Sequence, residues 1–206
     1  MPTFIDEIVS DIDWRISELA AIKSIPIKYS FRPDHKDIHI KYSIPAIYAI
    51  WEGFVKNCFV IYSNHLNTLS IKRDEISIQL LTHQLDSECD FNSPRVNFDS
   101  KQRMVSVIDS LLADIITIKP NVPTESNVNF KVLNKILERF CVDKIDDKYE
   151  SGLNKLLRIR NTIAHGENSI TVNMTHITEF TTLIENLMLD ITINIDRNER
   201  VGTYRK

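Results

Sequence analysis

The sequence is poor in the residues that mark flexible or cross-linked regions. It has four glycines and three cysteines in 206 residues, and no Gly/Ser-rich or Pro-rich segment that would form a linker. The cysteines, Cys58, Cys89 and Cys141, lie far apart, form no C-x-x-C pair and leave one unpaired in any disulfide scheme. We therefore expect one domain over residues 1–206, with reduced thiols in its core.

Long apolar runs and a strong charge of one sign are also missing. The chain has no run of about 18 consecutive apolar residues, and its first residues lack the basic region and hydrophobic segment of a secretion signal. We expect a cytoplasmic protein without a membrane segment. The formal net charge of −3 provides no general attraction to nucleic acid, so any contact with RNA has to come from a local cluster.

Motifs of the common cofactor sites do not occur. The chain contains no G-x-x-x-x-G-K-[ST], G-x-G-x-x-G or G-x-S-x-G, which removes the usual phosphate-loop, dinucleotide and nucleophile-elbow sites. His35 and His39 have the spacing of a metal-binding helix face, but Pro33 and the alternating residues after it argue against a helix there. We expect no metal and no cofactor.

The hydrophobic pattern is mostly helical and predicts an all-α bundle. Prolines and the alternation of Ile38, Ile40 and Tyr42 indicate an extended crossing segment over 24–42, followed by a helix with Ser43 as its N-cap. Residues 70–100 read as an irregular, partly extended insertion. The expected helices cover about 4–25, 43–66, 100–116, 129–140, 147–164 and 175–195.

One arginine occupies a position that helix packing usually gives to an apolar residue. Arg160 falls on the stripe formed by Leu153, Leu156, Leu157, Ile163 and Ala164 at spacings of three and four. Burying an unpaired guanidinium is expensive, so Arg160 should meet a carboxylate or line a cleft for an anionic ligand. The same helix carries the basic residues Lys155 and Arg158, and Asn161 and His165 project together from it.

A glutamate and a glycine interrupt the apolar stripe of the helix expected over 43–66. In Trp51-Glu52-Gly53-Phe54, a mid-helix glycine costs about 1 kcal/mol relative to alanine and often permits a close approach. In one interpretation, Glu52 reaches Arg160 and fixes its direction while Gly53 lets the two helices come near. In the other, both residues are incidental; we leave the two open.

The segment Arg160-Asn161-Thr162-Ile163-Ala164-His165 resembles the R-[polar]-x-x-x-H signature of the HEPN superfamily, small helical domains of prokaryotic toxins, defence systems and RNA-processing enzymes. Trp51-Glu52-Gly53-Phe54 and Ser126-Asn127-Val128-Asn129-Phe130 resemble further elements of HEPN ribonuclease-like families, so the likeness covers about residues 43–167. It implies a HEPN-type bundle and a metal-independent endoribonuclease, a toxin or defence effector acting on RNA as a homodimer. An antitoxin or other regulatory partner fits this class.

The resemblance assigns roles to the motif residues. His165 would serve as acid or base, Arg160 would grip the phosphate, and Asn161 would orient the phosphate or the histidine. Glu52, Arg158 and Lys155 would support the site or bind RNA.

Two alternatives stay open at this stage. On an ideal helix, Arg160 and His165 lie about 140° apart, whereas Arg158, Asn161 and His165 share a face, which makes Arg158 a rival phosphate contact. The chain could also be a non-catalytic dimerisation or nucleotide- or RNA-binding module, in which Arg160 pairs permanently with Glu52 and His165 caps the helix.

Overall fold

The computed structural model describes residues 2–89, 97–110, 115–124, 127–167 and 169–206. Within these ranges the chain forms seven α-helices, one short 3₁₀ helix and no strands, which confirms the all-α class. The elements are α1 (Phe4–Lys28), α2 (Pro33–Thr68), α3 (Ile78–Glu88), α4 (Phe98–Ser110), α5 (Phe130–Arg139), η1 (Asp147–Tyr149), α6 (Glu150–Ala164) and α7 (Met174–Val201).

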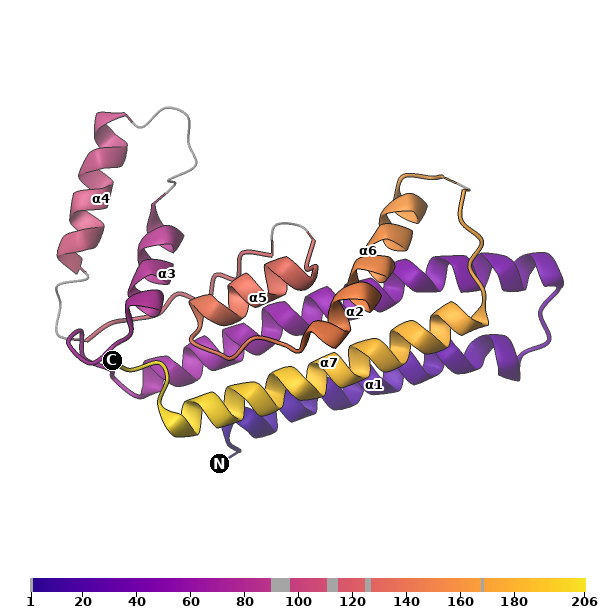
Figure 1. Cartoon of the computed structure of the whole chain (residues 1–206), viewed down its shortest axis with the longest axis horizontal. Coiled ribbons are helices and arrows are strands. Elements are labelled where there is room, and N and C mark those ends of the chain that lie inside the picture. Colours follow the sequence, from indigo (N-terminus) through magenta and orange to yellow (C-terminus); the bar gives the residue numbers. More distant parts are fainter. Residues whose placement is uncertain (1, 90–96, 111–114, 125–126, 168) are drawn as a thin grey trace.

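Three long helices form the body of the molecule. α1 and α7 lie side by side, α2 runs antiparallel to α1 and packs against both, and α6 crosses α2 (Figure 1). The core contains one continuous cluster of buried apolar side chains, and α2 supplies most of its aromatic members, Tyr48, Trp51, Phe54, Phe59 and Tyr62. α2 is therefore the central element against which α1, α6 and α7 pack.

α2 begins ten residues earlier than the sequence indicates, and the extended segment expected over 24–42 is wrong. α1 continues through Pro26 to Lys28, and Pro33 is the first residue of α2, where its missing N–H is harmless. Ser43 does not cap a helix; it lies inside α2, and its hydroxyl donates to the His39 carbonyl (2.8 Å). Packing of the flanking core residues outweighs the local preference of the prolines.

The central helix also has the length and composition of a membrane span. Its most apolar window of 18 residues has a mean hydropathy of 1.3, and half of that window is buried inside the bundle. A core helix of a globular domain meets the same criterion.

The region 70–100 is mainly helical where the structure describes it. Ile78 and Leu80 lie in α3, whose N-cap is Ser77, so the strand-like alternation that includes Ile76 is misleading. Among the described residues, the extended pairings in this part are two isolated bridges, Lys72 with Ile115 and Ile76 with Arg205. Residues 90–96, including Pro94, and 111–114 lie outside the described residues. The helix expected to reach Ile116 is wrong at that end, because the Ile116 N–H donates to the Ile71 carbonyl (3.2 Å) outside any helix. α3 and α4 stand together at one end of the bundle (Figure 1).

All three cysteines are free thiols. Cys58 is buried in the core, as expected, and burial raises its thiol pKa. Cys89 and Cys141 are only half-buried, so the expectation of a core position holds for one of the three.

Candidate functional site

The helix α6 presents the arginine beside its buried face. The Asp146 carboxylate accepts from the Lys148 N–H (2.8 Å) and starts η1, which leads into α6. The buried face of α6 consists of Leu153, Leu156, Ile159 and Ile163. Ala164 is exposed instead of buried because α6 ends there. Arg160 is half-buried at the edge of this face.

The partners of the Arg160 guanidinium within the described residues are neutral. Its Nη1 donates to Asn161 Oδ1 (2.8 Å) and Asn127 Oδ1 (3.4 Å), and the guanidinium carbon lies 4.6 Å from the centre of the Tyr48 ring. No carboxylate of the described residues forms an ion pair with it. Because amide oxygens and an aromatic face do not cancel a positive charge, the guanidinium remains able to bind an anion.

Two aromatic residues of α2 fix the chain segment that carries Asn127. The Val128 N–H donates to the Tyr48 hydroxyl (2.8 Å), and the Trp51 indole N–H donates to the Val128 carbonyl (3.0 Å). Burial raises the pKa of the Tyr48 hydroxyl, while the Val128 hydrogen bond and the Arg160 charge act in the opposite direction. The two segments that resemble HEPN elements thus meet at Arg160; Ser126 lies outside the described residues.

The contact expected between Glu52 and Arg160 is not formed. The Glu52 carboxylate instead binds Lys56 one helical turn away (2.8 Å). Gly53 does permit a close approach, but the group that approaches is the guanidinium of Arg15 in α1: a Cβ at Gly53 would lie 2.9 Å from Arg15 Nη1. Of the two interpretations left open, the contact of Glu52 with Arg160 is therefore wrong, while the close approach at Gly53 exists and is made by α1.

The candidate histidine is exposed at the end of α6. His165 is the C-cap, and its N–H donates to the Asn161 carbonyl (3.0 Å). Gly166 follows with φ +75°, a conformation that favours glycine. Lys41 of α2 donates to the Glu167 carbonyl (3.5 Å) and so contacts the loop that follows His165.

α2 therefore contacts both ends of the motif. Lys41 reaches the loop after His165, and Tyr48 lies under Arg160, two turns or about 10 Å further along the helix. The sequence pattern identified neither residue as part of the site. Lys41 fell in the segment predicted to be extended, and Tyr48 was treated only as part of an apolar stripe.

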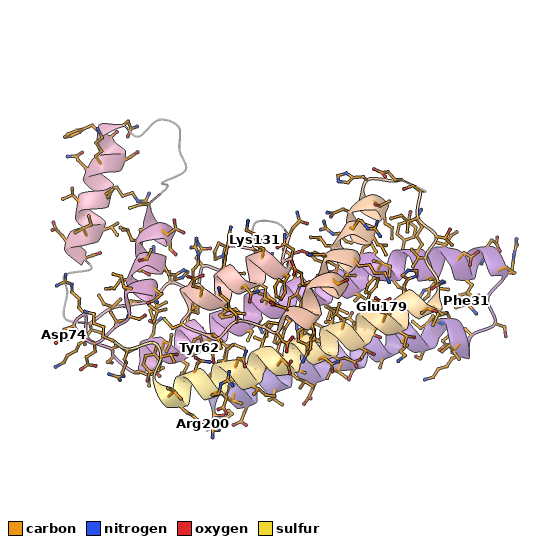
Figure 2. All side chains as sticks on the ribbon, in the orientation of Figure 1. Phe31, Tyr62, Asp74, Lys131, Glu179 and Arg200 are labelled. Carbon is orange, nitrogen blue, oxygen red and sulfur yellow. The ribbon has the colours of Figure 1, made fainter. Side chains whose placement is uncertain are left out.

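The remaining basic residues of α6 differ in their surroundings. Lys155 binds Glu179 of α7 (2.7 Å), which Figure 2 labels on the α7 ribbon beside α6. Arg158 is exposed, with no ion pair among the described residues. The ideal-helix argument for Arg158 still applies, because the His165 N–H donates to the Asn161 carbonyl and keeps the helical spacing at the C-cap. Arg158 therefore stays a rival candidate for the phosphate contact.

Within the described residues no group of three or more His, Cys, Asp or Glu side chains is arranged to hold a metal ion. His35 and His39 do lie on one helix, contrary to the expectation from Pro33. The His39 ring stacks on Phe31, between α1 and α2 (Figure 2), with 5.8 Å between ring centres.

Comparison with known proteins supplies an independent result. The chain matches the model described as HEPN_MAE_28990-like HEPN over residues 4–199. Searches of the curated proteins and of the solved structures find no significant match. The matched range extends from the start of α1 almost to the end of α7 and leaves out only the last two residues of that helix.

Proposed function

Because this chain belongs to the HEPN_MAE_28990 family, a family of HEPN domains, we propose that it is a metal-independent endoribonuclease that cleaves RNA as a homodimer. HEPN domains are often ribonucleases. One observation carries the proposal for this chain: Arg160 is half-buried with two neutral amide oxygens as its partners, five residues before an exposed histidine. A cation whose partners carry no charge can stabilise the phosphate, and an imidazole can transfer a proton, which are the two tasks in phosphodiester cleavage.

The proposed reaction is an attack by the 2′-hydroxyl oxygen on the adjacent phosphorus. His165 as base takes the hydroxyl proton, the new O2′–P bond forms, and the P–O5′ bond breaks. The leaving 5′-oxygen receives a proton from an acid. Arg160 donates hydrogen bonds to the non-bridging oxygens, whose negative charge grows in the transition state. The products are a 2′,3′-cyclic phosphate, or the 3′-phosphate after hydrolysis, and a 5′-hydroxyl.

Two copies of the chain solve a geometric problem in this reaction. One imidazole cannot act as base and acid on opposite sides of the same phosphorus, whereas the histidines of two copies can. A candidate contact surface between copies lies next to the site on α2, where Ile38 is 57% and Tyr42 is 59% exposed and the small residues Ala46 and Ala49 follow on the same side. Large apolar side chains at this exposure fit a surface that another copy covers.

The other candidate residues take supporting roles in this proposal. Asn161 holds the guanidinium, and Arg158, which faces solvent, contacts the RNA backbone at the edge of the cleft. Lys155 and Glu52 act through the packing of α6 and α2, because their charges are engaged with Glu179 and Lys56. A toxin or defence role in the cytoplasm, controlled by an antitoxin or another regulator, completes the proposal.

The decisive experiment identifies the ends of the cleaved RNA. Purified protein should cleave 5′-labelled RNA in EDTA and leave a cyclic or 3′-phosphate, and His165→Ala should remove this activity without changing the melting temperature. Tyr42→Asp should convert the dimer to a monomer in analytical ultracentrifugation and abolish cleavage. A 3′-hydroxyl product, or a strict need for magnesium, would refute the mechanism.

The alternative, a non-catalytic module, has Arg160 paired with Glu52 and His165 as a helix cap. The ion pair is not formed, since Glu52 binds Lys56, whereas His165 does occupy the C-cap of α6. The growth rate of bacteria that express the chain distinguishes a ribonuclease from a non-catalytic module. A ribonuclease toxin should arrest growth and His165→Ala should relieve the arrest. A harmless wild type that also leaves single-stranded and structured RNA intact would favour the non-catalytic module.

A further inference from the structure

The two amide oxygens that bind Arg160 come from different parts of the chain. Asn161 is its neighbour in α6, whereas Asn127 precedes it by 33 residues and lies in the segment before α5. A primary amide carries its acceptor oxygen and its NH₂ donor on the same carbon. Since both oxygens contact the same guanidinium nitrogen, both NH₂ groups remain as donors next to the cation. All three side chains are half-buried, so solvent and small groups reach them.

The backbone around Asn127 is fixed on both sides. Its N–H donates to the Thr124 carbonyl (2.9 Å), and its carbonyl accepts from the Asn129 N–H (2.9 Å). The next residue, Val128, is bound at both its N–H and its carbonyl by the aromatic side chains of α2. Asn129 then caps α5 by accepting from the Val132 N–H (2.8 Å). A side chain mounted on such a segment is pre-organised for binding.

We propose that Asn127 is a second substrate-binding amide of this site. This proposal rests on the function proposed above: the Asn127 NH₂ group donates to a non-bridging oxygen of the phosphate that Arg160 binds, next to the Nη1 nitrogen that both amides contact. A phosphodiester has two non-bridging oxygens, each able to accept more than one hydrogen bond, and a guanidinium flanked by two amides supplies donors for both. The R-[polar]-x-x-x-H pattern does not include this residue.

A purely structural role for Asn127 makes a different prediction. If Asn127 acts only by holding Arg160, its removal should have no further effect in a variant that lacks the arginine. If its NH₂ group binds the phosphate directly, Asn127→Ala should weaken binding in the Arg160→Ala background as well. The double variant therefore separates the two roles.

The experiment compares Asn127→Ala with wild type, and the double variant Asn127→Ala/Arg160→Ala with Arg160→Ala, with Asn129→Ser as the matched control. Asn129→Ser removes an amide two residues away and keeps the cap of α5, since asparagine and serine cap about equally well. Two quantities are measured: kcat/KM for RNA cleavage, and the Kd of an oligonucleotide of the same sequence with 2′-deoxyribose at the scissile position, which binds without being cleaved.

We expect Asn127→Ala to lower kcat/KM by about 10²-fold and to weaken oligonucleotide binding by about tenfold, as for loss of one donor to a reacting phosphate. In the Arg160→Ala background, Asn127→Ala should weaken binding by about tenfold again, and Asn129→Ser should stay within about threefold of wild type. Circular dichroism and the melting temperature establish that the variants are folded.

Oligonucleotide binding by the double variant within about threefold of Arg160→Ala would overturn the proposal and leave Asn127 a residue that acts only through Arg160. If wild type binds the oligonucleotide but cleaves no RNA, the nuclease function fails, and the binding data alone decide the role of Asn127. If wild type binds no oligonucleotide, the Asn127 proposal fails as well.

Discussion

Two arginines pack against opposite sides of α2, and their partners differ. Arg15, in α1, is 6% exposed; its Nε and Nη2 donate to the two Asp11 carboxylate oxygens (2.7 and 3.2 Å) and its Nη1 donates to the Ile50 carbonyl (2.8 Å). Its guanidinium also lies 4.4 Å from the centre of the Trp14 ring. Every feature of this environment compensates a buried charge, so Arg15 is a structural residue.

Arg160 has the same aromatic contact and no such compensation. The Tyr48 ring lies under it at a similar distance, but its hydrogen-bond partners among the described residues are amide oxygens. The comparison teaches that burial alone does not identify a functional arginine in this fold. The difference lies in whether the chain itself provides the counter-charge or leaves that position to a ligand.

The largest expected effect is the loss of RNA cleavage in the Arg160→Ala variant. Loss of the phosphate contact should lower kcat/KM by about 10³-fold, equivalent to about 4 kcal/mol of transition-state stabilisation. Thermal unfolding should change little, because no buried carboxylate loses its partner. Single-turnover cleavage at equal folded concentration measures the effect, and a large fall in melting temperature would instead make Arg160 a second structural arginine.

Arg15→Ala should give the opposite result. It leaves the largely buried Asp11 carboxylate and the Ile50 carbonyl without their donor, at a cost of about 3 kcal/mol of unfolding free energy. The rate of cleavage per folded molecule should be close to wild type. Denaturant titration with an activity assay on the folded fraction checks both; a specific loss of activity would contradict the division of roles.

Tyr48→Phe should weaken both stability and cleavage. The buried Val128 N–H loses its acceptor, which costs about 1–2 kcal/mol, and the segment carrying Asn127 loosens, so kcat/KM should fall about tenfold. The control is Tyr62→Phe, since the buried Tyr62 hydroxyl has no hydrogen-bond partner in the part of the chain that the structure describes. Removal of that hydroxyl should leave stability equal or higher. Equal effects from the two substitutions would remove the special role of Tyr48.

The smallest expected effect is a difference in stability between alanine substitutions at two helical glycines. Gly53→Ala places a methyl group 2.9 Å from Arg15 Nη1 and should cost about 1 kcal/mol after the gain in helix propensity is subtracted. In Gly152→Ala the methyl group meets only the end of the flexible Leu183 side chain, at 3.1 Å, so the propensity gain should be larger than the strain. The melting temperature of Gly152→Ala should therefore be higher than that of Gly53→Ala. Neither substitution should alter the rate of RNA cleavage.

The sequence predicted the elements that depend on local periodicity. The positions of α5 and α6 and the partial burial of Arg160 follow from apolar spacing and from caps such as Asp146 and Asn129. The HEPN family also followed from the motif and its neighbours. These features are encoded within a few turns of chain.

What the sequence could not predict depends on contacts between distant segments. The helix over 33–42 depends on residues such as Ile40 packing into the core, and the neutral surroundings of Arg160 depend on the segment before α5. The pair of Glu52 with Lys56, by contrast, is a local contact one helical turn apart. Lys41 and Asn127 were not given roles of their own, because no local pattern shows that their side chains lie near the motif.

The position of Pro45 has a mechanical consequence for the site. A proline has no N–H to donate to the Lys41 carbonyl, so α2 lacks one backbone hydrogen bond between Lys41 and Tyr48. A helix bends most easily where one of its hydrogen bonds is missing. Tyr48, which contacts Arg160, and Lys41, which contacts the loop after His165, lie on either side of that turn of α2. Bending of the helix there changes the distance between the Arg160 guanidinium and the His165 imidazole.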